Sequence, residues 1–126
     1  MVDLGLLVTA GSDGPCTVPD PIYGIYAACN HPDQAQSLTP LEALKTYTLW
    51  AAKSAGDDNL YGSLSAGKKA NFVVLDKNIL EVPNEAIKDI KLCGVILNGE
   101  RYKKGQPFHA ARFASKVLKS KFKGKL

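Results

Sequence analysis

The sequence predicts a single α/β fold, and three local patterns support this class. An apolar run at residues 4–10 ends abruptly at Gly11-Ser12-Asp13-Gly14-Pro15, which is typical of a buried strand leading into a loop. Thr39-Pro40-Leu41-Glu42 matches the capping box that starts many helices. Residues 72–75, Phe-Val-Val-Leu, are β-branched and aromatic and favour a second strand. With 126 residues and 45% hydrophobic content, the chain can build one ordinary domain with a modest core.

Two helices are expected in the first half of the chain. Asp20 can cap a short helix with Pro21 at its first position, and Ile22, Ile25 and Cys29 recur at helical spacing. The second helix starts at Thr39 and is predicted to run without a break to Gly56, a left-handed stop.

Extended segments and turns dominate the second half. Residues 61–64 and 90–97 are expected to be extended, with a turn at Ala66-Gly67 and a brief helix over 83–87. Asn98-Gly99 is the two-residue hairpin signal, because a type I′ turn needs positive φ at both central positions. The chain therefore closes with a β-rich segment.

Charge is distributed unevenly along the chain. Residues 1–100 carry 7 basic against 12 acidic side chains, whereas residues 101–126 carry 9 basic and no acidic ones. The apolar residues in this basic end predict an amphipathic helix from about 110 to 121: Phe113, Val117, Leu118 and Phe122. Charge at a terminus is more often simple solvation, so nucleic acid is not an expected partner.

Cysteine use and hydropathy indicate a cytoplasmic protein with no membrane partner. Cys16, Cys29 and Cys93 are odd in number and widely spaced, which fits reduced thiols better than a disulfide framework. No apolar run approaches the length of about 20 residues that a bilayer-spanning helix needs. The first residues lack the basic region of a signal peptide.

Asp13 is the candidate catalytic and metal-binding residue. A carboxylate at the end of a buried strand, among Gly, Ser and Pro, stands where α/β enzymes place a catalytic group or metal ligand. Aspartate after Gly-Ser is also a common turn former. From the residue pattern alone, both interpretations stay open.

An ordered set of segments carries a family resemblance. The segments are Leu-Leu-Val-Thr-Ala-Gly-Ser-Asp at 6–13, Pro-Asp-Pro-Ile-Tyr-Gly-Ile at 19–25, Leu-Thr-Pro-Leu-Glu-Ala-Leu at 38–44, Tyr-Thr-Leu-Trp-Ala-Ala at 47–52, and Gly-Ser-Leu-Ser-Ala-Gly-Lys-Lys-Ala-Asn-Phe-Val-Val-Leu-Asp at 62–76. Together they resemble the C-terminal end of the amidohydrolase superfamily, in the branch that includes N-substituted formamide deformylases. The resemblance covers residues 4 to about 103.

This resemblance implies a partial fold and a role for each segment. Residues 4–10 would be the eighth strand of a metal-dependent TIM barrel, and Asp13 the aspartate that binds the metal and shuttles a proton from the attacking water. The helix from Thr39 would be the last barrel helix, followed by small C-terminal β-strands. Gly62, Gly67 and Asp76 would be structural. The expected divisions are 1–56 for the end of the barrel, 57–106 for the β-strand segment and 107–126 for the basic tail.

The resemblance also implies zinc or another divalent metal, which this chain is not expected to hold alone. The family's His-x-His pair, its mid-barrel lysine or glutamate and its two later histidines lie upstream of the matched segment. His31 and His109 are the two histidines present, and neither matches a family ligand position. A zinc site needs at least about three protein ligands in fixed geometry. A separate site made of Cys16, Cys29 and His31 would fit no standard spacing.

We therefore expect a fragment or split subunit of an enzyme that hydrolyses non-peptide C–N bonds, inactive by itself because most metal ligands are missing. A single barrel strand exposes two edges, so the expected partner is a second copy of the chain or an upstream barrel-encoding chain. One alternative is a non-catalytic interaction module whose basic helix binds nucleic acid or an acidic partner. Another is a product with no present function. The substrate is not determined by these residues.

Overall fold

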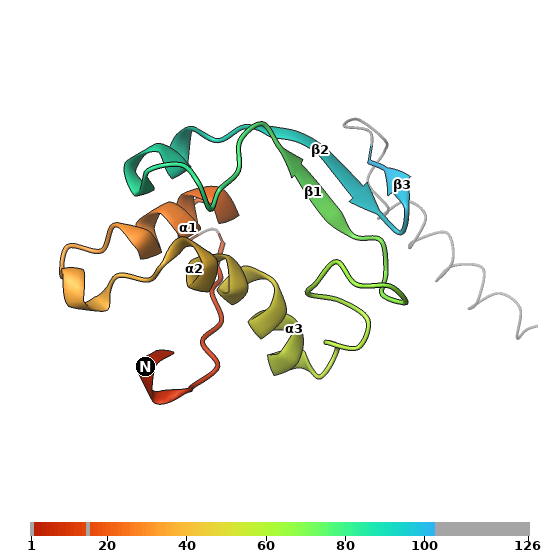
Figure 1. The fold of residues 1–126 in the computed structure, drawn as a ribbon, viewed down its shortest axis with the longest axis horizontal. Coiled ribbons are helices and arrows are strands. Elements are labelled where there is room, and N and C mark those ends of the chain that lie inside the picture. The colour runs from red at the N-terminus through yellow and green to blue at the C-terminus, as the bar shows by residue number, and fades with distance from the viewer. Residues whose placement is uncertain (1, 15, 103–126) are drawn as a thin grey trace, which may run out of the picture.

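A computed structural model describes residues 2–14 and 16–102. The elements in chain order are η1 (Val2–Leu4), α1 (Pro21–Cys29), η2 (Gln34–Gln36), α2 (Pro40–Tyr47), α3 (Leu49–Ala55), β1 (Phe72–Leu75), η3 (Asn84–Asp89), β2 (Leu92–Leu97) and β3 (Glu100–Arg101), where η marks a 3-10 helix. The strands form one antiparallel sheet in the order β1-β2-β3. The α-helices lie beside this sheet, and η3 packs against α1 (Figure 1).

Both predicted helix starts are confirmed. The Asp20 carboxylate accepts hydrogen bonds from the backbone N–H groups of Ile22 and Tyr23, and Pro21 occupies the first helical position of α1. At α2, the Glu42 N–H donates to the Thr39 hydroxyl, while the Glu42 carboxylate accepts from the Thr39 N–H at 2.9 Å. These bonds satisfy backbone donors that have no partner within the helix.

The helix expected from Thr39 to Gly56 is interrupted, so that prediction is partly wrong. Thr48 has φ −127° and ψ −96°, which divides the segment into α2 and α3. Its hydroxyl donates to the carbonyl oxygen of Leu44 at 2.8 Å, a side-chain bond that competes with regular helical pairing. Gly56 ends α3 with φ +75°, as its position predicted.

The hairpin at the end of the sheet is confirmed. Asn98 and Gly99 have φ values of +52° and +82°, and Leu97 pairs with Glu100 across the turn. Asp76 has the structural role expected of it, because its carboxylate accepts from the Lys91 N–H at 2.8 Å and joins the loop ends of β1 and β2. The extended piece expected at 61–64 is instead a series of bends.

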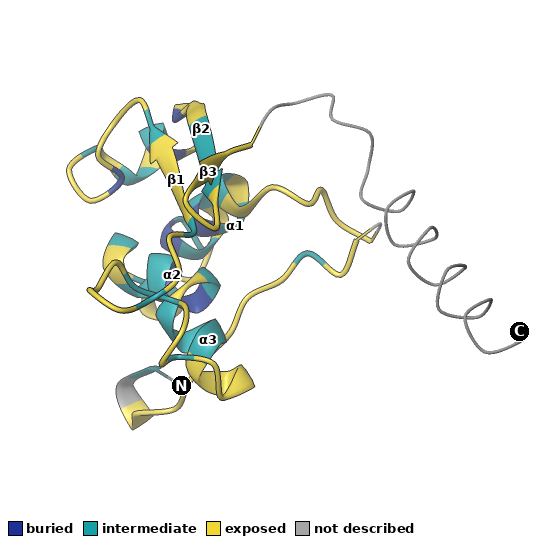
Figure 2. Ribbon diagram, turned by 90° about the vertical axis from the view of Figure 1, so that its right-hand side faces the viewer, coloured by how far each residue is buried: buried dark blue, intermediate teal, exposed yellow. Residues whose placement is uncertain are grey.

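The core lies where α1, α2 and η3 meet. Its buried apolar residues are Ile25, Cys29, Ala43, Ile79, Ile87 and Ile90. Thr46 is also buried, and its hydroxyl donates to the Ala43 carbonyl oxygen at 2.7 Å, so the polar group keeps a partner. Most of the ribbon outside this core is exposed (Figure 2).

Residues 4–10 do not form the predicted strand, and the described residues form no barrel. Val2–Leu4 is a 3-10 turn, and residues 6–12 follow an irregular path toward α1. The Ala10 N–H donates to the Thr46 carbonyl oxygen at 3.2 Å, which ties this segment to α2 rather than to a sheet. A strand needs a neighbouring strand to pair its backbone N–H and C=O groups. The described sheet consists of β1, β2 and β3, and residues 4–10 do not pair with any of them.

Two further predictions concern helices. The basic helix expected from about 110 to 121 lies outside the described residues. Among the residues that are described, no helix combines the length and the apolar character that crossing a bilayer would require.

Candidate functional site

Asp13 lies at the tip of a tight turn between the 6–12 segment and α1. Its φ is +46°, a left-handed conformation that aspartate tolerates better than most residues. Its carbonyl oxygen accepts a hydrogen bond from the Cys16 N–H at 2.9 Å, and its side chain is exposed. The Thr17 hydroxyl donates to the Ser12 carbonyl oxygen and braces the same loop. Asp13 is therefore a turn residue with a carboxylate open to solvent.

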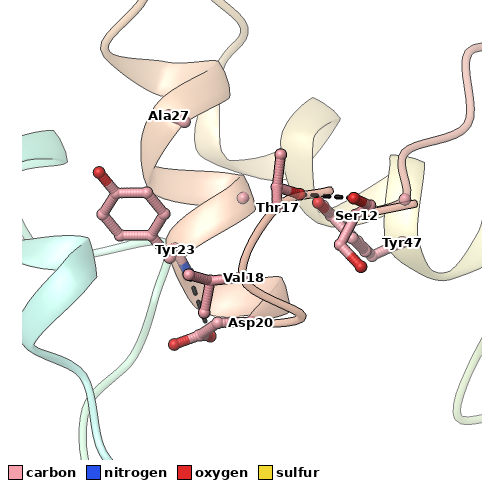
Figure 3. Close-up of a pocket in the computed structure, with 9 residues that line it drawn as sticks. Ser12, Thr17, Val18, Asp20, Tyr23, Ala27 and Tyr47 are labelled. Atoms are coloured by element: carbon pink, nitrogen blue, oxygen red, sulfur yellow. Dashed lines mark hydrogen bonds between the residues drawn. The ribbon is translucent and has the colours of Figure 1, made fainter. Parts of the chain in front are cut away.

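A cavity of about 450 Å³ lies beside this turn, between the loop, α1 and α2 (Figure 3). Its polar lining includes Ser12, Thr17, Asp20, Tyr23 and Tyr47. Asp13 does not line it, although the two residues before it in the chain do. Asp13 therefore follows two residues that line the cavity but is not itself part of the lining.

Two of the five polar side chains that line this cavity already have structural roles. The Asp20 carboxylate caps α1, and the Thr17 hydroxyl is bonded to the Ser12 carbonyl oxygen. A nucleophile or general base would need a free lone pair aimed at the reacting group. These two side chains therefore shape the loop and the start of α1 rather than perform chemistry.

Tyr47 is the feature of this cavity that the sequence analysis missed. Its ring lies against Gly24 in the middle of α1, where a Cβ would overlap the tyrosine hydroxyl oxygen. The available signal was Gly24 itself, because glycine inside a helix often marks a close approach of another group. Tyr47 also packs against the core, so its position is fixed from two sides.

The described residues do not build a metal site by themselves. Across 2–14 and 16–102, no three His, Cys, Asp or Glu side chains gather closely enough to hold an ion. Asp13 supplies a hard oxygen ligand suited to a divalent cation, but one carboxylate does not meet the ligand number of a zinc centre. The donor set described here therefore does not fit the implied metal without ligands from elsewhere.

Cys16, Cys29 and His31, considered as a separate metal site, are not brought together. Cys16 is exposed, whereas Cys29 is buried in α1, and burial raises the pKa of its thiol. A raised pKa keeps the thiol protonated, which suits a core residue better than a ligand. His31 lies in the loop after α1 and accepts a hydrogen bond from the Asp33 N–H at 3.1 Å. His109 lies outside the described residues.

Proteins similar in sequence to this chain include an N-substituted formamide deformylase and several imidazolonepropionases. The N-substituted formamide deformylase of Arthrobacter pascens is 29% identical over 106 residues, which are 79% of this chain and 20% of that protein. The imidazolonepropionase of Symbiobacterium thermophilum is 38% identical over 78 residues, 60% of this chain and 17% of that enzyme. The imidazolonepropionase of Streptococcus pyogenes serotype M2 is 30% identical over 86 residues, 66% of this chain and 20% of that enzyme.

The chain spans about a fifth of the length of these curated relatives. No solved structure matches it closely enough to add a further comparison. The pattern of the Amidohydrolase family matches residues 1–102, which include Asp13, all three α-helices and the sheet. Since this match covers 102 of 126 residues, the chain belongs to the Amidohydrolase family.

Proposed function

We propose that this chain is the Asp13-bearing fragment or split subunit of a metal-dependent hydrolase that cleaves non-peptide C–N bonds, and that residues other than 1–126 supply the remaining metal ligands. Family membership supports the reaction class, and one relative is named for removing formyl groups from N-substituted formamides. The chain spans about a fifth of that relative, which supports a part rather than a whole enzyme.

The observation that carries the proposal is that the apolar segment preceding Asp13 in the chain is exposed to solvent. Leu6 and Leu7 in the segment before it are 53% and 52% exposed, although their apolar sequence suits a buried strand. Exposed apolar side chains in a segment that has no neighbouring strand favour pairing with strands from outside the described residues. Such pairing would place Asp13 at the end of a strand, where a site with ligands from several strands can form.

In this site, the Asp13 carboxylate would act on the attacking water. It would accept a proton as the water oxygen bonds to the carbonyl carbon, and then pass that proton to the leaving nitrogen as the C–N bond breaks. The described residues give no complete metal site, so activation of the water depends on groups outside them. The chain alone is therefore expected to be inactive.

A separate barrel-encoding chain is a better partner for this role than a second copy. A homo-oligomer would multiply Asp13, but it would repeat the same two histidines, His31 and His109. Neither matches a ligand position of the family, so repetition would not complete the site. A different polypeptide can add the missing histidines.

A chimera tests this proposal. Residues 1–102 of this chain would replace the matching segment of the Arthrobacter pascens deformylase, both as a fusion and as two separately expressed chains. We expect formate release from an N-substituted formamide in both formats, and none from the deformylase body without the segment. A folded fusion that binds metal but releases no formate would contradict the proposed function.

A further inference from the structure

Another cavity lies between α3 and β1, and Tyr47 lines both this cavity and the one beside the Asp13 turn. The cavity between α3 and β1 has a volume of about 610 Å³ and is lined mainly by apolar side chains. Several of these are exposed in the described structure: Leu64 at 78%, Val73 at 55%, and Phe72 and Tyr61 at 37% each. We call this surface the α3–β1 groove. Apolar surface gathered in a groove favours an occupant that removes it from water.

Three of the six polar side chains that line the α3–β1 groove, those of Thr48, Ser63 and Asn71, form hydrogen bonds with other described residues. The Thr48 hydroxyl donates to the Leu44 carbonyl oxygen, and the Asn71 side-chain oxygen accepts from the Asn98 N–H at 2.6 Å. Ser63 and Ser65 share a hydroxyl–hydroxyl bond at 3.3 Å. A pocket for a small polar ligand would need converging free polar groups to orient it. The groove therefore suits apolar side chains of a polypeptide.

We propose that the α3–β1 groove is occupied by residues 110–122 of this same chain. These residues lie outside the described structure, and their sequence places Phe113, Val117, Leu118 and Phe122 on one half of a helix. The opposite half carries Arg112, Lys116 and Lys119, and a docked helix would keep these charges in water. Lys121 falls on the apolar half, where its long side chain would lie along apolar surface with the charged end in water.

Charge complementarity supports an occupant from this segment. Residues 103–126 contain 8 basic and no acidic side chains, whereas residues 1–102 contain 8 basic and 12 acidic ones. Among the described residues that line the groove, Asp57 is the charged one. A basic segment is attracted to an acidic body at modest ionic strength, and this attraction adds to apolar burial.

The chain between Tyr102 and residue 110 is long enough for residues 110–122 to reach the groove. It follows Tyr102, whose N–H donates to the Val95 carbonyl oxygen at 2.8 Å, and Val95 pairs with Val73 in the groove wall. Neighbouring strands are about 4.8 Å apart, so the segment begins roughly 10 Å across the sheet from the groove. Residues 103–109 provide ample chain to cross that distance, since an extended residue spans about 3.3 Å.

Site-specific photo-crosslinking in the full-length chain tests this inference without any partner. Phe113→p-benzoylphenylalanine places the crosslinker on the apolar half of the expected helix, and Arg112→p-benzoylphenylalanine places it near the middle of the polar half as a control. We expect position 113 to crosslink within one chain to peptides covering 61–64 or 72–75, several-fold more than position 112. Adding Leu64→Asp, an exposed position, should reduce the yield from position 113 several-fold.

Three results would overturn the inference. Equal groove crosslinking from positions 113 and 112 would mean that the apolar half is not what docks. Groove crosslinks found only between two chains would assign the groove to a second copy. Absence of groove crosslinks from position 113 would leave the segment outside the groove altogether. None of these results depends on metal or hydrolysis, so they are separate from the test of the proposed function.

Discussion

The phenol of Tyr47 occupies the space that a side chain on Gly24 would need. A Cβ at Gly24 would overlap the hydroxyl oxygen of Tyr47 and would lie 2.8 Å from its Cζ and 3.2 Å from its Cε2. This contact joins α1 to α2 beside the cavity next to Asp13. Gly24 therefore fixes how closely the two helices approach.

Gly24→Ala should destabilise the protein even though alanine favours helices. In a helix without neighbours, this change would stabilise by roughly 1 kcal/mol. Here the methyl group forces the Tyr47 ring out of its packed position, and overpacking of this kind costs about 1–3 kcal/mol. The measurement is the free energy of unfolding from urea titration.

Tyr47→Ala provides the control for that prediction. In this background the obstacle is gone, so adding Gly24→Ala should raise the free energy of unfolding instead of lowering it. The same sign in both backgrounds would show that the two residues are not coupled.

Thr39→Ala should lower the free energy of unfolding by about 1 kcal/mol, because it removes the side-chain acceptor for the Glu42 N–H at the start of α2. Thr39→Ser keeps the hydroxyl and should stay close to the parent. Equal losses in both variants would indicate that the methyl group, rather than the cap, is responsible.

The capping carboxylate gives stability a pH dependence. The bond from the Thr39 hydroxyl, followed by that from the Thr39 N–H, lowers the pKa of Glu42 below its usual value. Its contribution is therefore complete above the unfolded-state pKa of about 4.3 and is lost as pH falls through the lower folded-state pKa. Unfolding of the parent and Glu42→Gln should be compared from about pH 6 to about pH 3. The advantage of the parent should shrink toward acid, and a pH-independent difference would rule out this origin.

Two glycines separate the cost of backbone conformation from the cost of a close contact. Gly62 and Gly67 have nearly equal φ values of +86° and +87°, but only at Gly62 would a Cβ meet a neighbour, Ala52 Cβ at 2.7 Å. Alanine at either site should cost about 1–2 kcal/mol for the left-handed conformation. Gly62→Ala should cost measurably more than Gly67→Ala, because the loop must also move away from α3. Equal losses of unfolding free energy would contradict the close packing of this loop.

Features set by a few neighbouring residues could be predicted from the sequence. The cap at Asp20, the capping box at Thr39 and the turn at Asn98-Gly99 depend on hydrogen bonds or φ values within a short span, and the structure confirms all three. The interruption at Thr48 was missed because one φ/ψ pair, rather than a change of periodicity, divides α2 from α3.

The path of residues 4–10 and the shape of the cavity depend on contacts between residues far apart in the sequence, so local sequence patterns could not predict them. An apolar run indicates a strand only if a neighbouring strand is available, and in the described residues it is not. For the candidate site, Asp13 lies in a loop before α1 as expected, but the strand expected to precede that loop is not formed, and the catalytic role of Asp13 stays a prediction. The sequence did not reveal the contact of Gly24 with Tyr47, because that contact depends on how α1 and α2 pack.

Turnover of the deformylase chimera with Asp13→Asn, measured beside Asp20→Asn, tests the central claim most directly. Asparagine caps a helix about as well as aspartate, so Asp20→Asn should leave both α1 and formate release close to the parent chimera. Asp13→Asn removes the proton-accepting carboxylate, and turnover should fall by about 100-fold or more. An Asp13→Asn chimera that works as fast as Asp20→Asn would contradict the assignment of Asp13 to the hydrolytic site.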